Sequence, residues 1–102
     1  MSLQVIVSPE AETHIDEIDR WWRANRQAAP SLFVEELAEA FALLRVAPGI
    51  GRRHPHPEIR GVRRVLLRAT RHHVYYVRTP HAVIVLAIWG AVKGSGPDLT
   101  SL

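Results

Sequence analysis

Apolar residues in the first quarter of the chain recur at the spacing of an α-helix. They stand at i, i+4, i+7 and i+11, as Ala11, Ile15, Ile18 and Trp22. This spacing gathers them on one helical face and predicts a helix over about residues 9–26. Ser8 can cap the N-terminus of this helix, and Pro9 suits its first turn. We therefore expect a helix that buries one face.

A second stretch with the same spacing follows a break at Pro30. Its apolar positions are Phe33, Leu37, Ala40, Phe41 and Leu44. We expect Ser31 to cap this second helix. The helix should end near Val46, because the proline- and glycine-rich segment 48–51 follows. Two helices joined by so short a link form an antiparallel hairpin.

The second half of the chain contains strand patterns joined by short links. Residues 52–58 hold two prolines without periodicity, which predicts a loop, and strands are expected at about 60–68, 72–79 and 82–89. Links this short require antiparallel hairpins. The β-rich run 3–7 can pair with a late strand at a sheet edge. The predicted fold is one α+β domain ordered β-α-α-β-β-β, an antiparallel sheet with the N-terminal helical hairpin packed on one face.

Charge is distributed unevenly between the two halves. The first 50 residues hold four cationic and eight acidic side chains, whereas residues 51–102 hold nine cationic and two acidic ones. All the cations except Lys93 are arginine. Because arginine binds carboxylates and phosphates through a planar fork, the basic half suggests an anionic partner, either nucleic acid or an acidic protein segment. A GC-rich genome that places arginine on a solvated surface is the alternative.

Several classes of protein are excluded by composition. The chain has no cysteine, so it has no disulfide framework and no thiol chemistry. It begins without a secretory leader and has no apolar run near the roughly 20 residues of a membrane span, so we expect a cytoplasmic protein that does not enter a membrane. The histidines lack the spacing of a zinc site, and no phosphate-binding loop is present. We expect neither a metal nor another cofactor.

One predicted strand carries many arginines. If residues 60–68 are extended, their side chains alternate between two faces. One face carries Arg60, Val62, Arg64, Leu66 and Arg68. The other carries Arg63, Val65, Leu67 and Ala69, and it is apolar enough to bury against the helices. The first face should point away from the helices as a cationic surface for a phosphate backbone or an acidic amphipathic peptide.

The next predicted strand adds two tyrosines and another arginine. Tyr76 and Arg78 fall on one face, and Tyr75 falls on the other. Tyrosine beside arginine suits the stacking and clamping of nucleic acid. Aromatic residues in strands more often fill a core, however. We count Arg78 among the binding candidates and expect both tyrosines to be mainly structural.

Four segments together resemble the RelE/ParE superfamily of toxins from type II toxin–antitoxin systems, also known as plasmid stabilisation proteins. They are "LLRVAPGIG", "IRGVRRVLL", "HHVYYV" and "VIVLAIWGA". The resemblance extends from Val5 to about Leu99. It implies a bacterial toxin that inhibits growth until a cognate antitoxin wraps it with a C-terminal segment and forms a hetero-oligomer. The expected binding surface consists of Arg60, Val62, Arg64, Leu66, Arg68 and Arg78.

The superfamily divides by target. RelE-like members cleave mRNA on the ribosome without a metal, and many use a Tyr or His near the C-terminus, whereas ParE-like members inhibit DNA gyrase by contact. No Tyr or His follows His81 here, which favours a ParE-like toxin. An endoribonuclease is the alternative, with weak catalytic candidates Arg64, Arg68 and Tyr76. His72 or His73 are less favoured acid–base candidates. The third possibility is a homologue that has lost its activity and only binds its antitoxin.

Overall fold

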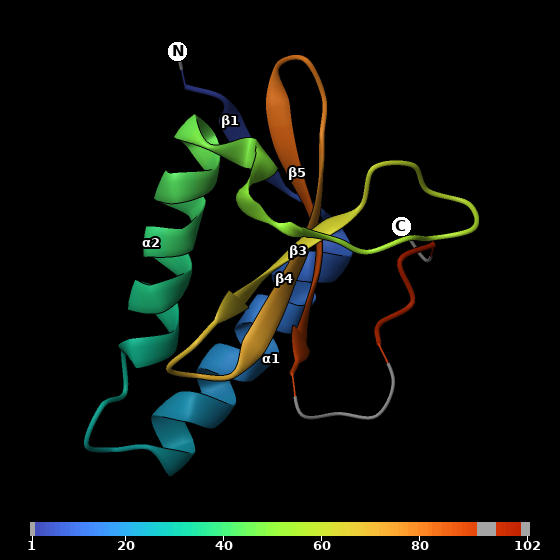
Figure 1. Cartoon of the computed structure of the whole chain (residues 1–102). Helices are drawn as coiled ribbons and strands as arrows, with labels where there is room; N and C mark the ends of the chain where they lie inside the picture. Colours follow the sequence, from blue (N-terminus) through green and yellow to red (C-terminus); the bar gives the residue numbers. More distant parts are fainter. Residues whose placement is uncertain (1, 92–95, 101–102) are drawn as a thin grey trace.

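The computed structural model describes residues 2–91 and 96–100, in which two helices cover one face of a five-stranded sheet (Figure 1). The helices are α1 (Pro9–Asn25), α2 (Leu32–Val46) and the short 3-10 helix η1 (Pro48–Ile50). The strands are β1 (Gln4–Val7), β2 (Arg52–Arg53), β3 (Arg63–Leu67), β4 (His72–Arg78) and β5 (Ala82–Gly90). The α+β class and the predicted element order are confirmed, with one short strand added.

The strands lie in the order β1-β5-β4-β3-β2. The hairpins that join β3, β4 and β5 are antiparallel, as predicted. β1 pairs with β5 at a sheet edge, as expected, but runs parallel to it, with Val5 opposite Val83. No hairpin turn fixes the direction of β1, because both helices and three strands separate it from β5 along the chain. The sheet is therefore antiparallel except at this edge.

The boundaries of the arginine-rich strand differ from the prediction. β3 covers five residues rather than 60–68. Gly61, with a φ of 75°, belongs to a turn before it, and Arg71, with a φ of 63°, belongs to the turn after it. Segment 52–58 was predicted to be loop throughout, but its first two residues form β2 against Arg63 and Arg64. Two residues are too few to show a period of two, so their pattern gave no strand signal.

The two predicted helix caps have different outcomes. The Ser8 hydroxyl accepts a hydrogen bond from the Ala11 amide at 3.1 Å and donates to the Leu86 carbonyl at 3.3 Å, which ties α1 to β5. Ser31 makes no side-chain cap bond, so that prediction is wrong. Its φ of −98° and ψ of 2° differ from the extended conformation that directs a capping hydroxyl toward the first turn.

The core between the helices and the sheet uses the predicted helical faces. Its buried helical residues are Ala11, Trp22, Phe33, Leu37 and Leu44. Val65 and Leu67 pack against them from β3, which confirms the inward face of this strand. Neither of the two long helices described is apolar enough over a sufficient length to cross a membrane.

A second cluster covers the sheet face opposite the helices. Its buried members are Val62, Tyr75, Leu86, Ala87 and Leu99. The loop after β2 and the described C-terminal segment lie on this side of the sheet (Figure 1). A β-bulge contributes, because the β4–β5 register shifts between Tyr75 and Tyr76 and leaves Leu86 as an extra residue. This face is therefore partly covered by the chain itself.

Candidate functional site: a groove between α2 and β3

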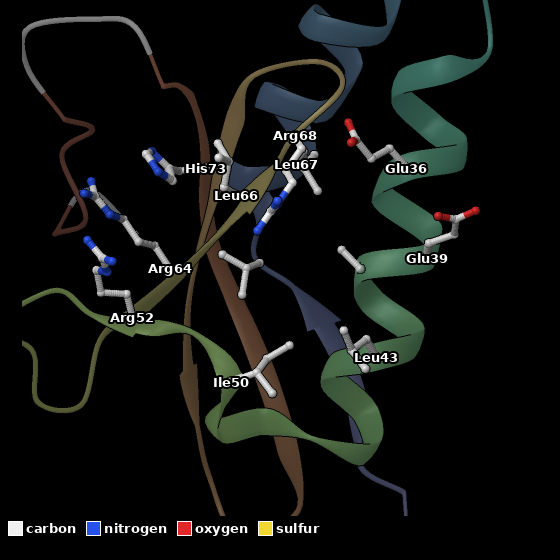
Figure 2. A pocket seen from close by; sticks show the side chains of 12 residues that line it. Glu36, Glu39, Leu43, Ile50, Arg52, Arg64, Leu66, Leu67, Arg68 and His73 are labelled. Atoms are coloured by element: carbon white, nitrogen blue, oxygen red, sulfur yellow. The ribbon is translucent and has the colours of Figure 1, made fainter.

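A groove of about 740 Å³ lies between α2 and the outer side of β3 (Figure 2). Its lining residues are Glu36, Glu39, Ala40, Leu43, Ile50, Arg52, Arg64, Val65, Leu66, Leu67, Arg68 and His73. Figure 2 shows Glu36, Glu39 and Leu43 on the helical side, with Arg52, Arg64 and His73 on the opposite side. The groove therefore has an acidic wall, a basic wall and apolar residues between them.

Three apolar side chains in this groove are exposed. Leu43 and Ile50 are each 50% exposed, and Leu66 is 41% exposed. They come from α2, η1 and β3 and gather in one place because these elements meet here. Clustered apolar side chains on a surface indicate a site that a partner covers.

The basic wall begins with two arginines on neighbouring strands. Arg52 and Arg64 are register partners in the β2–β3 ladder, so both project from the same face of the sheet. The Arg64 Nη1 donates a long hydrogen bond of 3.4 Å to the Tyr75 hydroxyl. Within the described part of the chain, neither arginine forms an ion pair with a carboxylate. Their charge is available to an anionic partner.

Two histidines lie beside this pair of arginines. The ring centroids of His54 and His73 are 5.0 and 6.0 Å from that of Tyr75. Burial lowers the pKa of His73 below its usual 6.5, and the positive charge of Arg64 lowers it further. The pKa of His54 is lowered for the same two reasons. The neutral form of both imidazoles is favoured, so the fixed charge of this wall comes from arginine.

Glu36 on the acidic wall holds the β3–β4 turn. Its carboxylate accepts hydrogen bonds from the Ala69 amide at 2.7 Å, the Thr70 amide at 3.0 Å and the Thr70 hydroxyl at 2.7 Å. Burial raises the pKa of Glu36, but the hydrogen bonds from Thr70 and Ala69 outweigh burial and bring the pKa below 4.5. Glu36 thus fixes the end of β3 to α2, and Glu39 is the groove carboxylate nearer the middle of the helix.

The structure brings together three of the six predicted binding residues. Arg64, Leu66 and Arg68 all line the groove. Arg60 instead lines a separate hollow of about 430 Å³ beside the loop after β2. Val62 was expected to be open, but it is 4% exposed because Ile59 and Leu99 belong to the cluster around it. Arg78 stands at the other end of β4, opposite Val83. The binding role of all six stays a prediction.

Sequence reasoning missed five residues of the groove, namely the two carboxylates Glu36 and Glu39 and the residues Leu43, Ile50 and Arg52. Leu43 is an apolar residue outside the predicted core face of α2, which is a signal that could have identified it. Ile50 and Arg52 lie in segments predicted as a helix end and a loop. Nothing local in those segments indicates that they approach β3.

Tyr76, a catalytic candidate from the sequence, is fully buried on the helical side of the sheet. Its hydroxyl donates to the Pro48 carbonyl at 2.7 Å and accepts from the Gly51 amide at 2.9 Å. Burial raises the pKa of Tyr76 above 10. These contacts give Tyr76 a structural role, because its hydroxyl ties η1 to the sheet.

His72 and His73 occupy opposite faces of β4. The ring of His72 lies 5.5 Å from that of Phe33, among residues from the helices. His73 lies opposite Leu66 and lines the groove. Among the described residues, no group of three or more His, Asp and Glu side chains is arranged to hold a metal ion.

The helical hairpin on one face of a mostly antiparallel sheet, in this element order, is a fold that solved toxin structures also have. Two solved structures share the fold. One, from the chromosomal ParDE toxin–antitoxin system of P. aeruginosa, has a TM-score of 0.70 and 17% identity, over 87% of this chain and 96% of that one. The other, an arginine double mutant of E. coli toxin RelE in the free state, has a TM-score of 0.57 and 16% identity, over 90% and 86%.

The family follows from the sequence as a whole. A family model described as the ParE toxin of the type II toxin–antitoxin system, parDE, matches residues 5–92. This match spans most of the chain, so the chain belongs to the ParE toxin family. No curated protein sequence matches it.

Proposed function

We propose that this chain is a toxin that binds and inhibits DNA gyrase, and that a cognate antitoxin neutralises it through the groove between α2 and β3. The observation that carries the antitoxin assignment is the combination of exposed Leu43, Ile50 and Leu66 with two arginines, Arg52 and Arg64, that pair with no carboxylate among the described residues. An antitoxin tail rich in aliphatic and acidic residues matches this combination. Gyrase as the target comes from the ParE family to which the chain belongs.

Two features support inhibition by contact over RNA cleavage. The Tyr76 side chain is buried and its hydroxyl is hydrogen-bonded to two backbone groups, so it is not presented to a substrate. The sequence after His81 contains neither Tyr nor His to protonate a leaving group. The toxin proposed here therefore needs a binding surface for gyrase and no acid–base machinery.

The test is expression of the chain without an antitoxin in a bacterial host. We expect a DNA-damage response while amino-acid incorporation continues, and inhibition of supercoiling when purified protein is added to gyrase. Rapid arrest of translation with cleaved mRNA would refute gyrase as the target. Normal growth with unaffected gyrase would instead identify a homologue that only binds its antitoxin.

An endoribonuclease is the second candidate, because one group of side chains has suitable chemistry. Arg64, Tyr75, His54 and His73 lie in contact on one face. A neutral imidazole can take the 2′-hydroxyl proton, and a guanidinium can stabilise the charge on phosphorus. The tyrosine in this group is Tyr75, whereas the catalytic candidate from the sequence was Tyr76. Loss of ribosome-dependent RNA cleavage in His73→Ala, at an unchanged melting temperature, is the result that would support it.

A further inference from the structure

The loop between β2 and β3 lines the separate hollow of about 430 Å³, and the ionisable side chains of this hollow are cationic or imidazole. They are Arg53, His54, His56, Arg60 and Arg63. None of the described residues that line the hollow is acidic. Asp98 is an acidic neighbour of His56, but it does not belong to the lining. Positive charges gathered in one place repel each other, so an anion bound between them would be stabilised.

The pairing of β2 with β3 divides four arginines between this hollow and the groove. Arg52 and its register partner Arg64 line the groove. Arg53 and its register partner Arg63 line the hollow, because successive side chains of a strand alternate between its two faces. Arg53 and Arg60 are exposed, and neither forms an ion pair with a carboxylate within residues 2–91 and 96–100. The hollow is therefore a second cationic surface with charge to offer a ligand.

Contacts within the loop hold the hollow in one shape. The His54 amide donates to the Val62 carbonyl at 2.9 Å and joins the two ends of the loop. His56 Nδ1 accepts from the amides of Glu58 and Ile59, each at 3.1 Å. The side chain of Ile59 packs against the cluster that contains Val62. A site that is formed before its ligand arrives loses less conformational entropy on binding.

The same contacts fix two hydrogen-bond donors at the hollow. Because His56 Nδ1 accepts hydrogen bonds, the neutral ring carries its proton on Nε2 and can donate there. The Arg63 Nη1 donates to the Gly51 carbonyl at 2.8 Å, which uses one of the five N–H groups of the guanidinium. The hollow thus combines two anchored residues with the exposed guanidinium groups of Arg53 and Arg60.

We propose that this hollow binds phosphate groups of double-stranded DNA, the substrate of the gyrase that the toxin inhibits. This inference rests on the proposed function and adds a second partner to it, because the bound toxin would contact the DNA as well as the enzyme. The planar fork of arginine matches the oxygens of a phosphate. Such contacts supply most of the affinity for DNA that does not depend on its sequence.

The lining of the hollow favours duplex DNA over two other anionic partners. Among its described residues there is no Phe, Tyr or Trp on which the bases of a single strand could stack. The large apolar side chains that are exposed elsewhere on the described surface are also missing from this lining. The hollow therefore differs from the groove, where Leu43 and Leu66 are exposed, and it suits a ligand that is charged without being amphipathic.

The test is binding of a short labelled DNA duplex to the purified chain, followed by fluorescence anisotropy at several salt concentrations. The variant Arg53→Ala/Arg60→Ala removes the two exposed arginines of the hollow and keeps Arg63, whose internal bond supports the fold. The control Arg20→Ala/Arg45→Ala removes the same charge from exposed positions on α1 and α2. We expect the first variant to bind on the order of tenfold more weakly than the control, with a slope of log affinity against log salt concentration smaller by about two.

Equal affinities and equal salt slopes for the two variants would overturn the DNA site. Tighter binding of single-stranded RNA, or displacement of the duplex by poly-glutamate as effectively as by unlabelled duplex, would also overturn it. Inhibition of gyrase by a chain without a DNA site would leave the proposed function standing, whereas a chain that binds DNA through the hollow and does not inhibit gyrase would overturn the proposed function alone. If the double variant does not fold, Arg60→Ala replaces it, with an expected decrease in slope of about one.

Discussion

Tyr76→Phe tests the role of the buried hydroxyl that ties η1 to the sheet. The substitution removes one oxygen and leaves the ring in place among Leu44 and Val83. Two hydrogen bonds are lost, one to the Pro48 carbonyl and one from the Gly51 amide. Because the ring still fills the same space, the change in the free energy of unfolding reports mainly on these two bonds.

The expected loss of stability follows from the number of bonds. Each contributes a net 0.5 to 1.5 kcal/mol, so Tyr76→Phe should lower the free energy of unfolding by about 1–3 kcal/mol. For a domain of this size, each kcal/mol lowers the melting temperature by about 4–8 °C. The backbone of residues 48–51 should also exchange its amide hydrogens faster, because its attachment to the sheet is gone.

Thermal unfolding followed by circular dichroism measures this effect, and Tyr75→Phe is the matched control. The Tyr75 hydroxyl receives one long hydrogen bond of 3.4 Å from Arg64, so its removal should cost about 0.5 kcal/mol or less. Equal melting temperatures for Tyr76→Phe and the unmodified chain would refute the structural role. A toxin that lost activity in Tyr76→Phe without losing stability would return this residue to the catalytic candidates.

Four further substitutions test other parts of the fold. Arg71 has a φ of 63°, so Arg71→Gly should raise the free energy of unfolding by about 0.5–1 kcal/mol in a denaturant titration. The folded-state pKa of Glu36 is lowered, so its contribution is present above pH 4.5 and disappears as the pH falls through the folded value. The Glu36→Ala variant should therefore be less stable than the unmodified chain at pH 7, and it should lose less stability than that chain when the pH falls below 4.5. Unfolding measured at several pH values tests both expectations. Leu37 is buried, and Leu37→Ala should cost about 2–5 kcal/mol, whereas Arg64→Ala should weaken antitoxin binding at an unchanged melting temperature.

The helices were predictable because the spacing of apolar residues within each helix indicates which face is buried. The predicted apolar positions of α1 and α2 are either buried or partly buried against the core, and the helix ends agree within one residue. The alternation of β3 was predictable for the same reason, because Val65 and Leu67 do pack inward. Its ends were not, because Gly61 and the turn at Arg71 interrupt a pattern that continues through them.

The groove was harder to predict because it depends on contacts between distant residues. The prediction of a cationic face assumed that the alternation of side chains along the strand alone decides which of them are exposed. Val62 shows the error, since Leu99, 37 residues later in the numbering, belongs to the cluster that buries it. Arg64, Leu66 and Arg68 do line one groove, but the apolar part contributed by Leu43 and Ile50 requires α2 and η1 to meet at the edge of β3.

The two arginines of β3 make different contacts, although they are adjacent in the sequence. Arg63 points to the helical side and donates to the Gly51 carbonyl, and the Tyr76 hydroxyl bonds to the same segment at Pro48 and Gly51. Arg64 points the other way and presents its charge at the groove. The guanidinium of Arg63 is thus used within the fold, whereas that of Arg64 lies in the groove beside the exposed side chain of Leu66. Arginines on both faces of one short strand are therefore compatible with a folded domain, since the inner guanidinium bonds to the chain's own backbone and the outer one lies at a groove on the surface.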